Sequence, residues 1–222
     1  AHRGGAINYP ENTMLAYREA VESVGVDVIE SDLYLTADGI LVCNHNGDID
    51  ETSNVNGDIP LESIYLKSER HFIADMTLTE LRQYNFGFYF EDENGERPYK
   101  DAHLEIPTLD ELFSAFYENH PDLLFILEIK EGGERGREAC KKLGEVIAKY
   151  PDYADNVVIG TFNEEIELAL VRLYRCTGDK TFLDLSRYFV DMRGNIVVEP
   201  IYECVKWEGG EGNIRYGFGI RT

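Results

Sequence analysis

The chain has 222 residues, of which 42 are Asp or Glu and 21 are Lys or Arg, giving a formal net charge of -21. This charge repels phosphate backbones and anionic lipids, so we expect neither nucleic acid nor an anionic membrane as partner, whereas a small phosphate compound beside a cation is allowed. No apolar run approaches the roughly 20 residues of a membrane helix, and the length suits one domain that buries roughly 70% of its unfolded surface.

The cysteines are widely spaced and form neither a CxxC pair nor a zinc pattern. Reduced, mostly buried thiols are therefore expected, which favours a cytoplasmic location. The sequence opens on a motif at Ala1, so we expect that N-terminal targeting information is missing from it. The four cysteines are Cys43, Cys140, Cys176 and Cys204.

The first elements alternate in a simple order. A Gly-rich loop that contains His2-Arg3-Gly4-Gly5 precedes a helix, which Asn12 or Thr13 caps and Gly25 ends. A strand is predicted over residues 26–36, a turn over 37–39, and a second apolar strand over 40–43, which ends just before His45.

The strand over residues 26–36 carries two carboxylates in an apolar stretch. Side chains two apart in a strand point to the same side, so Glu30 and Asp32 share one space, where their charges repel. A divalent cation, or a bound water shared with Lys or Arg, resolves this repulsion. The alternative is an exposed strand end on which both acids are solvated.

Residues 47–105 are polar and irregular, which predicts an inserted subdomain or long loop with one helix signal at 77–81. Beyond them, Thr108 and Glu111 fit a capping box at the start of a helix. The apolar run 123–130 is continuous enough for a parallel strand covered on both faces. A helix over 135–150 and a strand over 157–162 complete an alternation that is typical of a parallel α/β sheet or barrel.

Polar residues follow four successive predicted strands. In a (β/α)₈ barrel the C-terminal strand ends meet at one mouth, so these side chains are expected to share one pocket. Three carboxylates suit a hard cation, two histidines suit proton transfer, and an Arg with a Lys suits an anion. The set predicts a metal-assisted phosphoester hydrolase. Its members are His2, Arg3, Glu30, Asp32, His45, Glu128 and Lys130.

The same residues belong to an ordered series of motifs over about residues 1–163. They are His2-Arg3-Gly4, Pro10-Glu11-Asn12-Thr13, Glu30-x-Asp32, Thr36-x-Asp38-Gly39, a strand ending in His45, and Glu128-x-Lys130. This series resembles the glycerophosphodiester phosphodiesterase family. The resemblance implies a TIM-type (β/α)₈ barrel and metal-dependent hydrolysis of glycerophosphodiesters to sn-glycerol 3-phosphate and an alcohol.

The resemblance also implies a role for each matching residue. His2 and His45 correspond to the acid/base pair, and Arg3 and Lys130 to the phosphate contacts. Attack by water and attack by the glycerol 2-hydroxyl are both open. The ligands of the divalent cation, Ca²⁺ or Mg²⁺, are expected to be Glu30, Asp32 and Glu128.

Two features depart from the family pattern. The family usually has an acid directly after its second histidine, where this chain has Asn46. The resemblance is also expected to fade after residue 163, so that 1–163 is a phosphodiesterase-like barrel portion with an insertion at 47–105. The barrel is then incomplete or divergent in its C-terminal third, and 164–222 is a divergent helical and Gly-rich segment.

Within that segment, residues 169–189 resemble a helical hairpin of the (α/α)-barrel glycoside hydrolases that remove L-arabinofuranose. Two alternatives to a phosphodiesterase therefore stay open. One is a catalytically inactive remnant of the same fold that binds metal or phosphodiester, and the other is a carbohydrate-active fragment. Three histidines that match no motif are expected to be surface or hydrogen-bonded residues: His71, His103 and His120.

Overall fold

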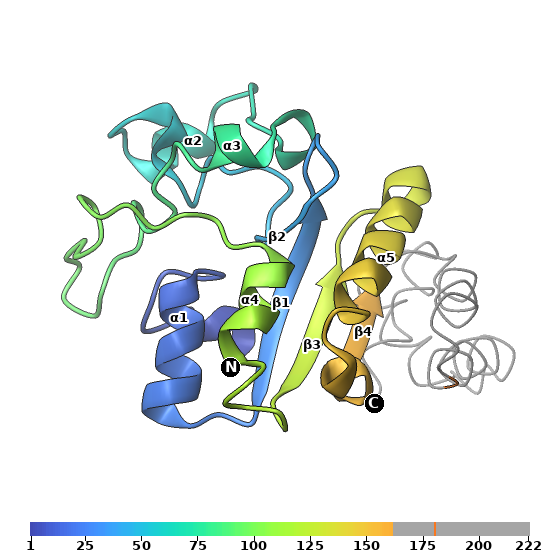
Figure 1. The fold of residues 1–222 in the computed structure, drawn as a ribbon. Helices are drawn as coiled ribbons and strands as arrows, with labels where there is room; N and C mark the ends of the chain where they lie inside the picture. Colours follow the sequence, from blue (N-terminus) through green and yellow to red (C-terminus); the bar gives the residue numbers. More distant parts are fainter. Residues whose placement is uncertain (162–179, 181–222) are drawn as a thin grey trace, which may run out of the picture. The chain divides into compact units, whose positions relative to one another are not determined.

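A computed structural model describes residues 1–161 and Lys180 (Figure 1). The chain divides into two units, Ala1–Asn163 and Glu164–Thr222. The expected C-terminal segment, including 169–189, lies outside the described residues except for Lys180. The elements are η1 (His2–Gly4), α1 (Met14–Arg18), η2 (Glu19–Val24), β1 (Val28–Leu35), β2 (Leu41–Cys43), η3 (Asn54–Asn56), α2 (Leu61–Tyr65), η4 (Ile73–Asp75), α3 (Leu78–Leu81), α4 (Leu109–Phe116), β3 (Leu124–Ile129), α5 (Gly133–Ile147), η5 (Pro151–Asn156) and β4 (Val157–Thr161).

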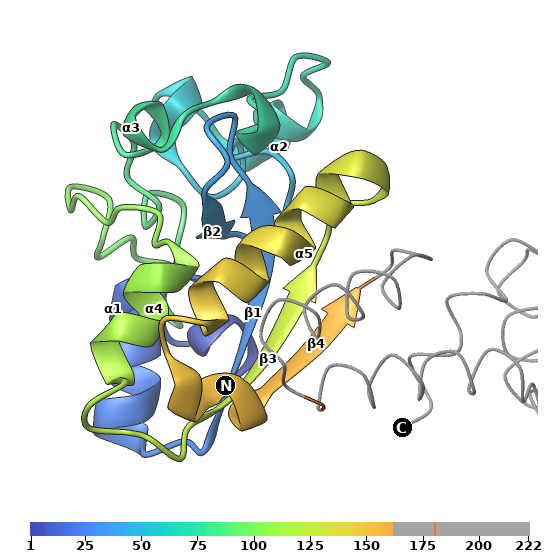
Figure 2. The same ribbon diagram turned by 45° about the vertical axis from the view of Figure 1, so that its right-hand side comes forward.

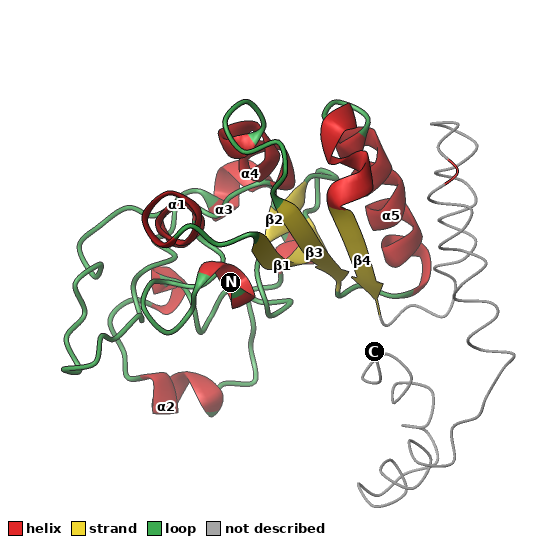
Figure 3. Ribbon diagram, turned by 90° about the horizontal axis from the view of Figure 1, so that it is seen from below, coloured by secondary structure: helices red, strands yellow, loops and turns green. Residues whose placement is uncertain are grey.

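The four described strands form one sheet in the order β2-β1-β3-β4. β1 pairs with β3, and β3 with β4, in parallel, which confirms the predicted α/β alternation. Helices α4 and α5 lie on one face of this curved sheet (Figure 3), and α5 contacts β1, β2 and β3 (Figure 2). The register sets Asp32 of β1 directly beside Glu128 of β3.

One face of β3 supplies the core between the sheet and its helices. Phe125 is buried and its ring centroid lies 4.7 Å from that of Phe113 on α4 and 4.9 Å from that of Tyr153 on η5. On the opposite face, Leu124 is 42% exposed and Ile126 41% exposed. The prediction of a strand covered on both faces is therefore wrong for the described residues, because their helices cover only one face.

The N-terminal helix begins and ends where its sequence predicts. The Thr13 side chain accepts a hydrogen bond from the Ala16 N–H, and Gly25 closes the π-helical end η2 with a left-handed φ of 76°. The preceding loop packs tightly on this helix at Gly4. A Cβ added there would lie 2.9 Å from Tyr17 Cδ1, so a side chain at this position would clash.

β1 and β2 form an antiparallel hairpin, with Leu33 paired to Cys43 and Leu35 to Leu41. The C-terminal end of β2 therefore points opposite to the C-terminal ends of β1 and β3. The predicted turn over 37–39 is thus confirmed, but β2 is not one of the parallel strands whose C-terminal ends were expected to meet at one mouth. His45 reaches the level of Asp32 because β1 continues past Asp32 before the hairpin returns the chain.

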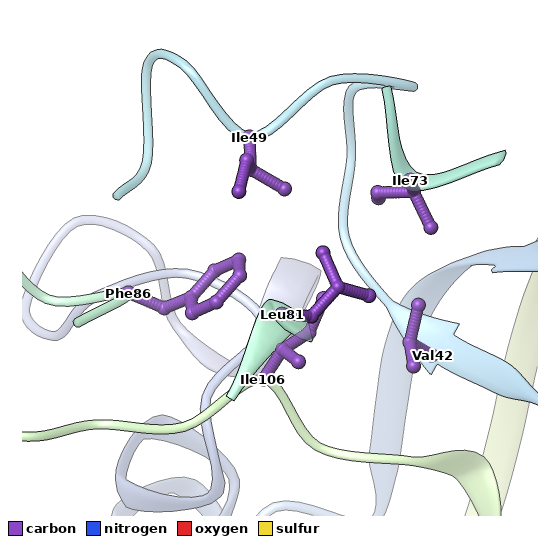
Figure 4. Close-up of a cluster of buried hydrophobic side chains, with 6 residues drawn as sticks. All are labelled: Val42, Ile49, Ile73, Leu81, Phe86 and Ile106. Carbon is purple, nitrogen blue, oxygen red and sulfur yellow. The ribbon is translucent and has the colours of Figure 1, made fainter. Parts of the chain in front are cut away.

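The predicted insertion over 47–105 is a set of short helices with an apolar core of its own. The Thr77 side chain accepts a hydrogen bond from the Glu80 N–H, and the Glu80 carboxylate accepts one from the Thr77 N–H, so α3 begins with a capping box. The core is attached to the sheet because one of its members lies on β2 (Figure 4). The cluster consists of Val42, Ile49, Ile73, Leu81, Phe86 and Ile106.

The aromatic stretch of the insertion packs into two buried clusters. Phe86 belongs to the cluster of Figure 4, while Phe88 and Tyr89 form a second buried cluster with Ile64. The chain then returns to β2, since the Cys43 N–H donates to the Pro107 carbonyl. No helix among the described residues combines the length and apolarity that crossing a membrane requires.

Candidate active site

Three carboxylates meet on the face of the sheet opposite α4 and α5. Glu30 and Asp32 alternate along β1, and Glu128 lies on the neighbouring β3. One oxygen atom from each residue lies within 4.8 Å of the others. Asp32 is only 1% exposed, so the cluster is not a set of solvated acids at a strand end. This burial requires a positive partner.

Lys130 supplies positive charge to two of these acids. Its Nζ lies 3.0 Å from Asp32 Oδ1 and 2.8 Å from Glu128 Oε2. Burial by itself would lower the pKa of Lys130, but the hydrogen bonds and charges of Glu128 and Asp32 outweigh it and raise this pKa. Lys130 is therefore a cation at the centre of the acidic cluster.

Arg3 approaches the cluster from the loop after Ala1. Its backbone N–H donates to Glu30 Oε2 at 2.8 Å, and its Nε lies 3.6 Å from Asp32 Oδ2. The Arg3 backbone has a φ of 49°, a left-handed conformation that non-glycine residues rarely adopt. A salt bridge of 2.9 Å from Arg3 Nη1 to Glu11 Oε2 fixes the guanidinium. Arg3 thus contacts two of the three acids at once.

Glu30 carries the clearest electrostatic signal in the cluster. Burial raises the pKa of Glu30, and the charges of Asp32 and Glu128 raise it further, against the lowering effect of the Arg3 N–H. His2 flanks this residue, with its Nε2 3.9 Å from Glu30 Oε2 and 71% of its side chain exposed. The ring of His2 is therefore open to a bound molecule.

Asn12 also contributes to the cluster, although the sequence predicted for it only a helix-capping role and a place in a family motif. Its Oδ1 accepts hydrogen bonds from the hydroxyls of Tyr17 at 2.8 Å and Ser31 at 3.2 Å. Its Nδ2 is therefore free to donate to Asp32 Oδ2 at 3.4 Å. The Pro10-Glu11-Asn12-Thr13 motif was the available signal, because Glu11 and Asn12 both hold groups of the cluster.

His45 lies in the loop after β2, beside the acidic strand. The N–H of Asn44 donates to the Asp32 carbonyl at 3.0 Å, which fixes this loop to β1. Nδ1 of His45 lies 3.0 Å from Oδ1 of Asn46. The structure joins six of the seven expected side chains by ion pairs or in the carboxylate cluster. Among the described residues, His45 makes no ion pair with the three acids.

Two of the three histidines that match no motif, His71 and His103, behave as expected. Nδ1 of His71 lies 2.9 Å from Asp50 Oδ1 in the insertion, and His103 lies on the surface, 3.6 Å from Glu105. The carbonyl of His120 accepts a hydrogen bond from the Tyr153 hydroxyl. None of the three belongs to the carboxylate cluster.

The arrangement fits a hard divalent cation. Its three carboxylates supply oxygen ligands at one point, and the ion pairs of Lys130 show that this point already attracts a positive charge. Arg3 and Lys130 add N–H donors that suit phosphate oxygens. Together these groups can bind a phosphodiester, and the exposed imidazole of His2 can exchange a proton with it.

Comparisons with known proteins agree with this chemistry. The model of the glycerophosphoryl diester phosphodiesterase family matches residues 2–182, which extends beyond the expected limit at 163. A glycerophosphodiester phosphodiesterase of Caldanaerobacter subterraneus subsp. tengcongensis is 36% identical over 73% of this chain and 57% of that protein. Human glycerophosphodiester phosphodiesterase 1 is 29% identical over 75% of this chain and 43% of that protein.

Solved structures share the fold. A glycerophosphoryl diester phosphodiesterase domain from Mycobacterium tuberculosis superposes with a TM-score of 0.59 at 21% identity, over 90% of this chain and 65% of that one. A phosphodiesterase of Oleispira antarctica in complex with sn-glycerol-3-phosphate gives 0.58 at 24% identity, over 79% and 60%. The expected TIM-barrel fold is thus confirmed. The chain spans 57 to 61% of the length of the first curated relatives that it matches.

Proposed function

Since the chain belongs to the glycerophosphoryl diester phosphodiesterase family, we propose that it hydrolyses glycerophosphodiesters to sn-glycerol 3-phosphate and an alcohol. The carboxylate cluster carries this proposal, because Glu30, Asp32 and Glu128 bring oxygen atoms within 4.8 Å of one another next to Lys130. The Oleispira antarctica relative was solved with sn-glycerol-3-phosphate as its product, which supports a small-molecule substrate of this class.

The cofactor in this proposal is Ca²⁺ or Mg²⁺, held by Glu30, Asp32 and Glu128. When bound, such a cation neutralises negative charge on a phosphoryl oxygen and polarises an attacking hydroxyl. Arg3 and Lys130 stand against the same acids and offer N–H donors to the remaining phosphate oxygens. Asn12 keeps Asp32 in place through its amide.

His2 and His45 are the proposed acid/base pair. One ring removes a proton from the attacking hydroxyl as the new P–O bond forms, and the other gives a proton to the leaving alkoxide as the old P–O bond breaks. Proton delivery matters because an unprotonated alkoxide leaves poorly. The attacking hydroxyl is that of water or the 2-hydroxyl of the glycerol, and both fit this pair.

The test is release of sn-glycerol 3-phosphate from glycerophosphocholine and glycerophosphoethanolamine, with Ca²⁺, with Mg²⁺ and with a chelator. We expect turnover only with added cation, and a loss of about 10²-fold or more in kcat for His2→Ala. His103→Ala is the matched control, since this exposed histidine lies outside the cluster. Full activity in chelator, or in His2→Ala, would remove the proposed mechanism.

One observation favours a second candidate, a remnant that binds metal or phosphodiester without turnover. The position after His45 holds Asn46, so an amide oxygen, and not a carboxylate oxygen, faces Nδ1 of this imidazole. Calorimetric binding of Mg²⁺ or Ca²⁺ without turnover of any diester would support the remnant. Arabinoside cleavage would be required for the carbohydrate-active alternative, which rests on residues outside the described part of the chain.

We also propose that residues 1–163, with their insertion at 47–105, form the phosphodiesterase-like portion and that 164–222 form a separate segment. Limited proteolysis near residue 163 that leaves metal binding intact is the expected result.

The buried free thiols of Cys43 and Cys140 fit the proposed cytoplasmic location. Cell fractionation tests it, and recovery of the chain outside the cytoplasmic fraction would contradict it.

A further inference from the structure

The loop after β2 contains a chain of hydrogen-bonding groups that the proposed site does not use. Nδ1 of His45 lies 3.0 Å from Oδ1 of Asn46. On the other side of the same amide, Asn46 Nδ2 donates to Oε2 of Glu51 at 3.3 Å. A single amide group therefore connects the imidazole to a carboxylate that lies six residues away.

The chemistry of the three groups fixes the direction of these hydrogen bonds. An ionised carboxylate only accepts, so Glu51 requires the NH₂ group of Asn46 to face it. The amide oxygen must then face His45, and an amide oxygen only accepts as well. A neutral His45 ring can satisfy it only by carrying its proton on Nδ1, which leaves the lone pair on Nε2.

The loop is built to keep this arrangement. The buried Asn44 amide donates to the Asn46 carbonyl at 2.7 Å and to the Asp48 carbonyl at 3.2 Å. The N–H of Asn44 donates in turn to the Asp32 carbonyl on β1. The backbone on both sides of His45 is therefore tied to the strand that carries the acidic cluster.

The other carboxylate oxygen of Glu51, Oε1, lies close to an arginine. Oε1 of Glu51 lies 3.8 Å from Nη1 of Arg70, which also lies 3.9 Å from Asp48 Oδ1. Nη1 of Arg70 is buried and makes no hydrogen bond with the described residues. Arg70 thus draws Oε1 of Glu51 toward itself, and Oε2 is left for the amide of Asn46.

We propose that Asn46 and Glu51 are positioning residues for His45. The amide of Asn46 passes the orienting effect of the Glu51 carboxylate to the imidazole, holds the proton on Nδ1, and makes Nε2 the nitrogen that exchanges a proton with the substrate. Through Asn46, Glu51 thereby orients the His45 ring as an acid directly after the histidine would. The catalytic importance of this relay rests on the role of His45 in the proposed function. The tautomer of His45 does not depend on that role.

Nitrogen NMR of ¹⁵N-labelled protein tests the tautomer without substrate. We expect the long-range ¹H–¹⁵N correlations of His45 to show a protonated Nδ1 and an unprotonated Nε2 in the native chain. Glu51→Ala frees the amide to rotate and Asn46→Leu removes the acceptor, so both variants are expected to lose this preference. Glu62→Ala, at an exposed position on α2, is the matched control and should keep it.

A double variant separates the relay from a general effect of the loop. Asn46→Asp by itself keeps an acceptor for the Nδ1–H of His45 but faces Glu51 with a second carboxylate. In Asn46→Asp with Glu51→Gln, the amide at position 51 donates to the carboxylate at position 46, which still accepts from His45. The double variant should recover the Nδ1-protonated ring. An unchanged tautomer in both Glu51→Ala and Asn46→Leu, or a native ring protonated on Nε2, overturns the proposal.

Kinetics connect the relay to catalysis. We expect Asn46→Leu to lower kcat about tenfold with little change in KM, since one orienting hydrogen bond is lost, and the double variant to recover most of it. If the native protein turns over no diester, the proposed function fails while the NMR result still decides on the relay. If Glu51→Ala and Asn46→Leu keep full kcat in an active enzyme, the positioning role is refuted.

Discussion

Neutralising Glu30 should stabilise the protein in the absence of metal. The Glu30→Gln side chain has nearly the same shape, and its oxygen can still accept from the Arg3 N–H that donates to Glu30 at 2.8 Å. The substitution removes the repulsion between Glu30 and its two neighbours, Asp32 and Glu128. Burial and these neighbours already raise the pKa of Glu30, which means that its charge is disfavoured in the folded protein.

The size of the effect follows from the distances. Two carboxylate charges at the 4.8 Å limit within which these oxygens lie repel by about 1 kcal/mol in water and by about 3 kcal/mol at an effective dielectric constant of about 20. Lys130 offsets roughly one of the two neighbouring charges, and the hydrogen bond from Arg3 weakens when its acceptor is neutral. We therefore expect a net stabilisation of about 1 to 2 kcal/mol, or a rise in Tm of about 3 to 6 °C.

With bound metal, the native protein should instead be more stable than Glu30→Gln. A divalent cation at about 100 times its Kd stabilises the native protein by about 2.7 kcal/mol, and Glu30→Gln loses most of that gain because it removes one of three carboxylate ligands. Thermal melts in chelator and in Mg²⁺ or Ca²⁺ measure both effects, with the exposed Glu93→Gln as matched control. A lower Tm than the native chain in chelator, or an undiminished shift with metal, would refute the reasoning.

Three further predictions concern stability and reactivity. Burial alone would raise the pKa of Asp50, but hydrogen bonds from the backbone N–H of His71, the amide of Asn56 and the ring of His71 outweigh it and lower this pKa from its ordinary value. Asp50→Asn should therefore cost about 2 kcal/mol at neutral pH, and urea titrations should show this cost shrinking as the pH falls below about 4, whereas a cost independent of pH would contradict the account. Burial raises the pKa of the Cys43 thiol to about 12, so a thiol reagent at pH 8 should label it only on unfolding, and rapid labelling of native protein would show the strand to be open. Phe113→Ala should destabilise the protein by about 3 to 5 kcal/mol in the same titrations because it empties a fully buried site, and a loss below about 1 kcal/mol would contradict the packing.

Local sequence rules predicted much of the described fold. The capping box of Thr108 and Glu111 depends on residues three apart, so it can be identified from the sequence and is present at the start of α4. Strand β3 was predicted from a continuous apolar run. What this run did not reveal is that only one of its faces is covered by the described residues, since burial depends on elements distant in the chain.

The sequence also predicted which residues form the candidate site. Glu30 and Asp32 share a face because strand side chains alternate, which local geometry alone requires. Their meeting with Glu128 depended on the parallel register of β1 with β3, which an ordered motif series made predictable. The roles of these residues in catalysis stay predictions until the variants are measured.

The tertiary structure decided how His45 is presented. The sequence by itself determined that a histidine follows the short strand β2, but the antiparallel hairpin and the continuation of β1 decided where that histidine lies. The tertiary structure also decided which carboxylate takes the place of the acid that the family has directly after its second histidine. Glu51 contacts Asn46 only because of the fold of the loop. Hydrogen bonds between side chains depend on where the backbone turns, and that turn is held here by contacts to Asp32 on another element.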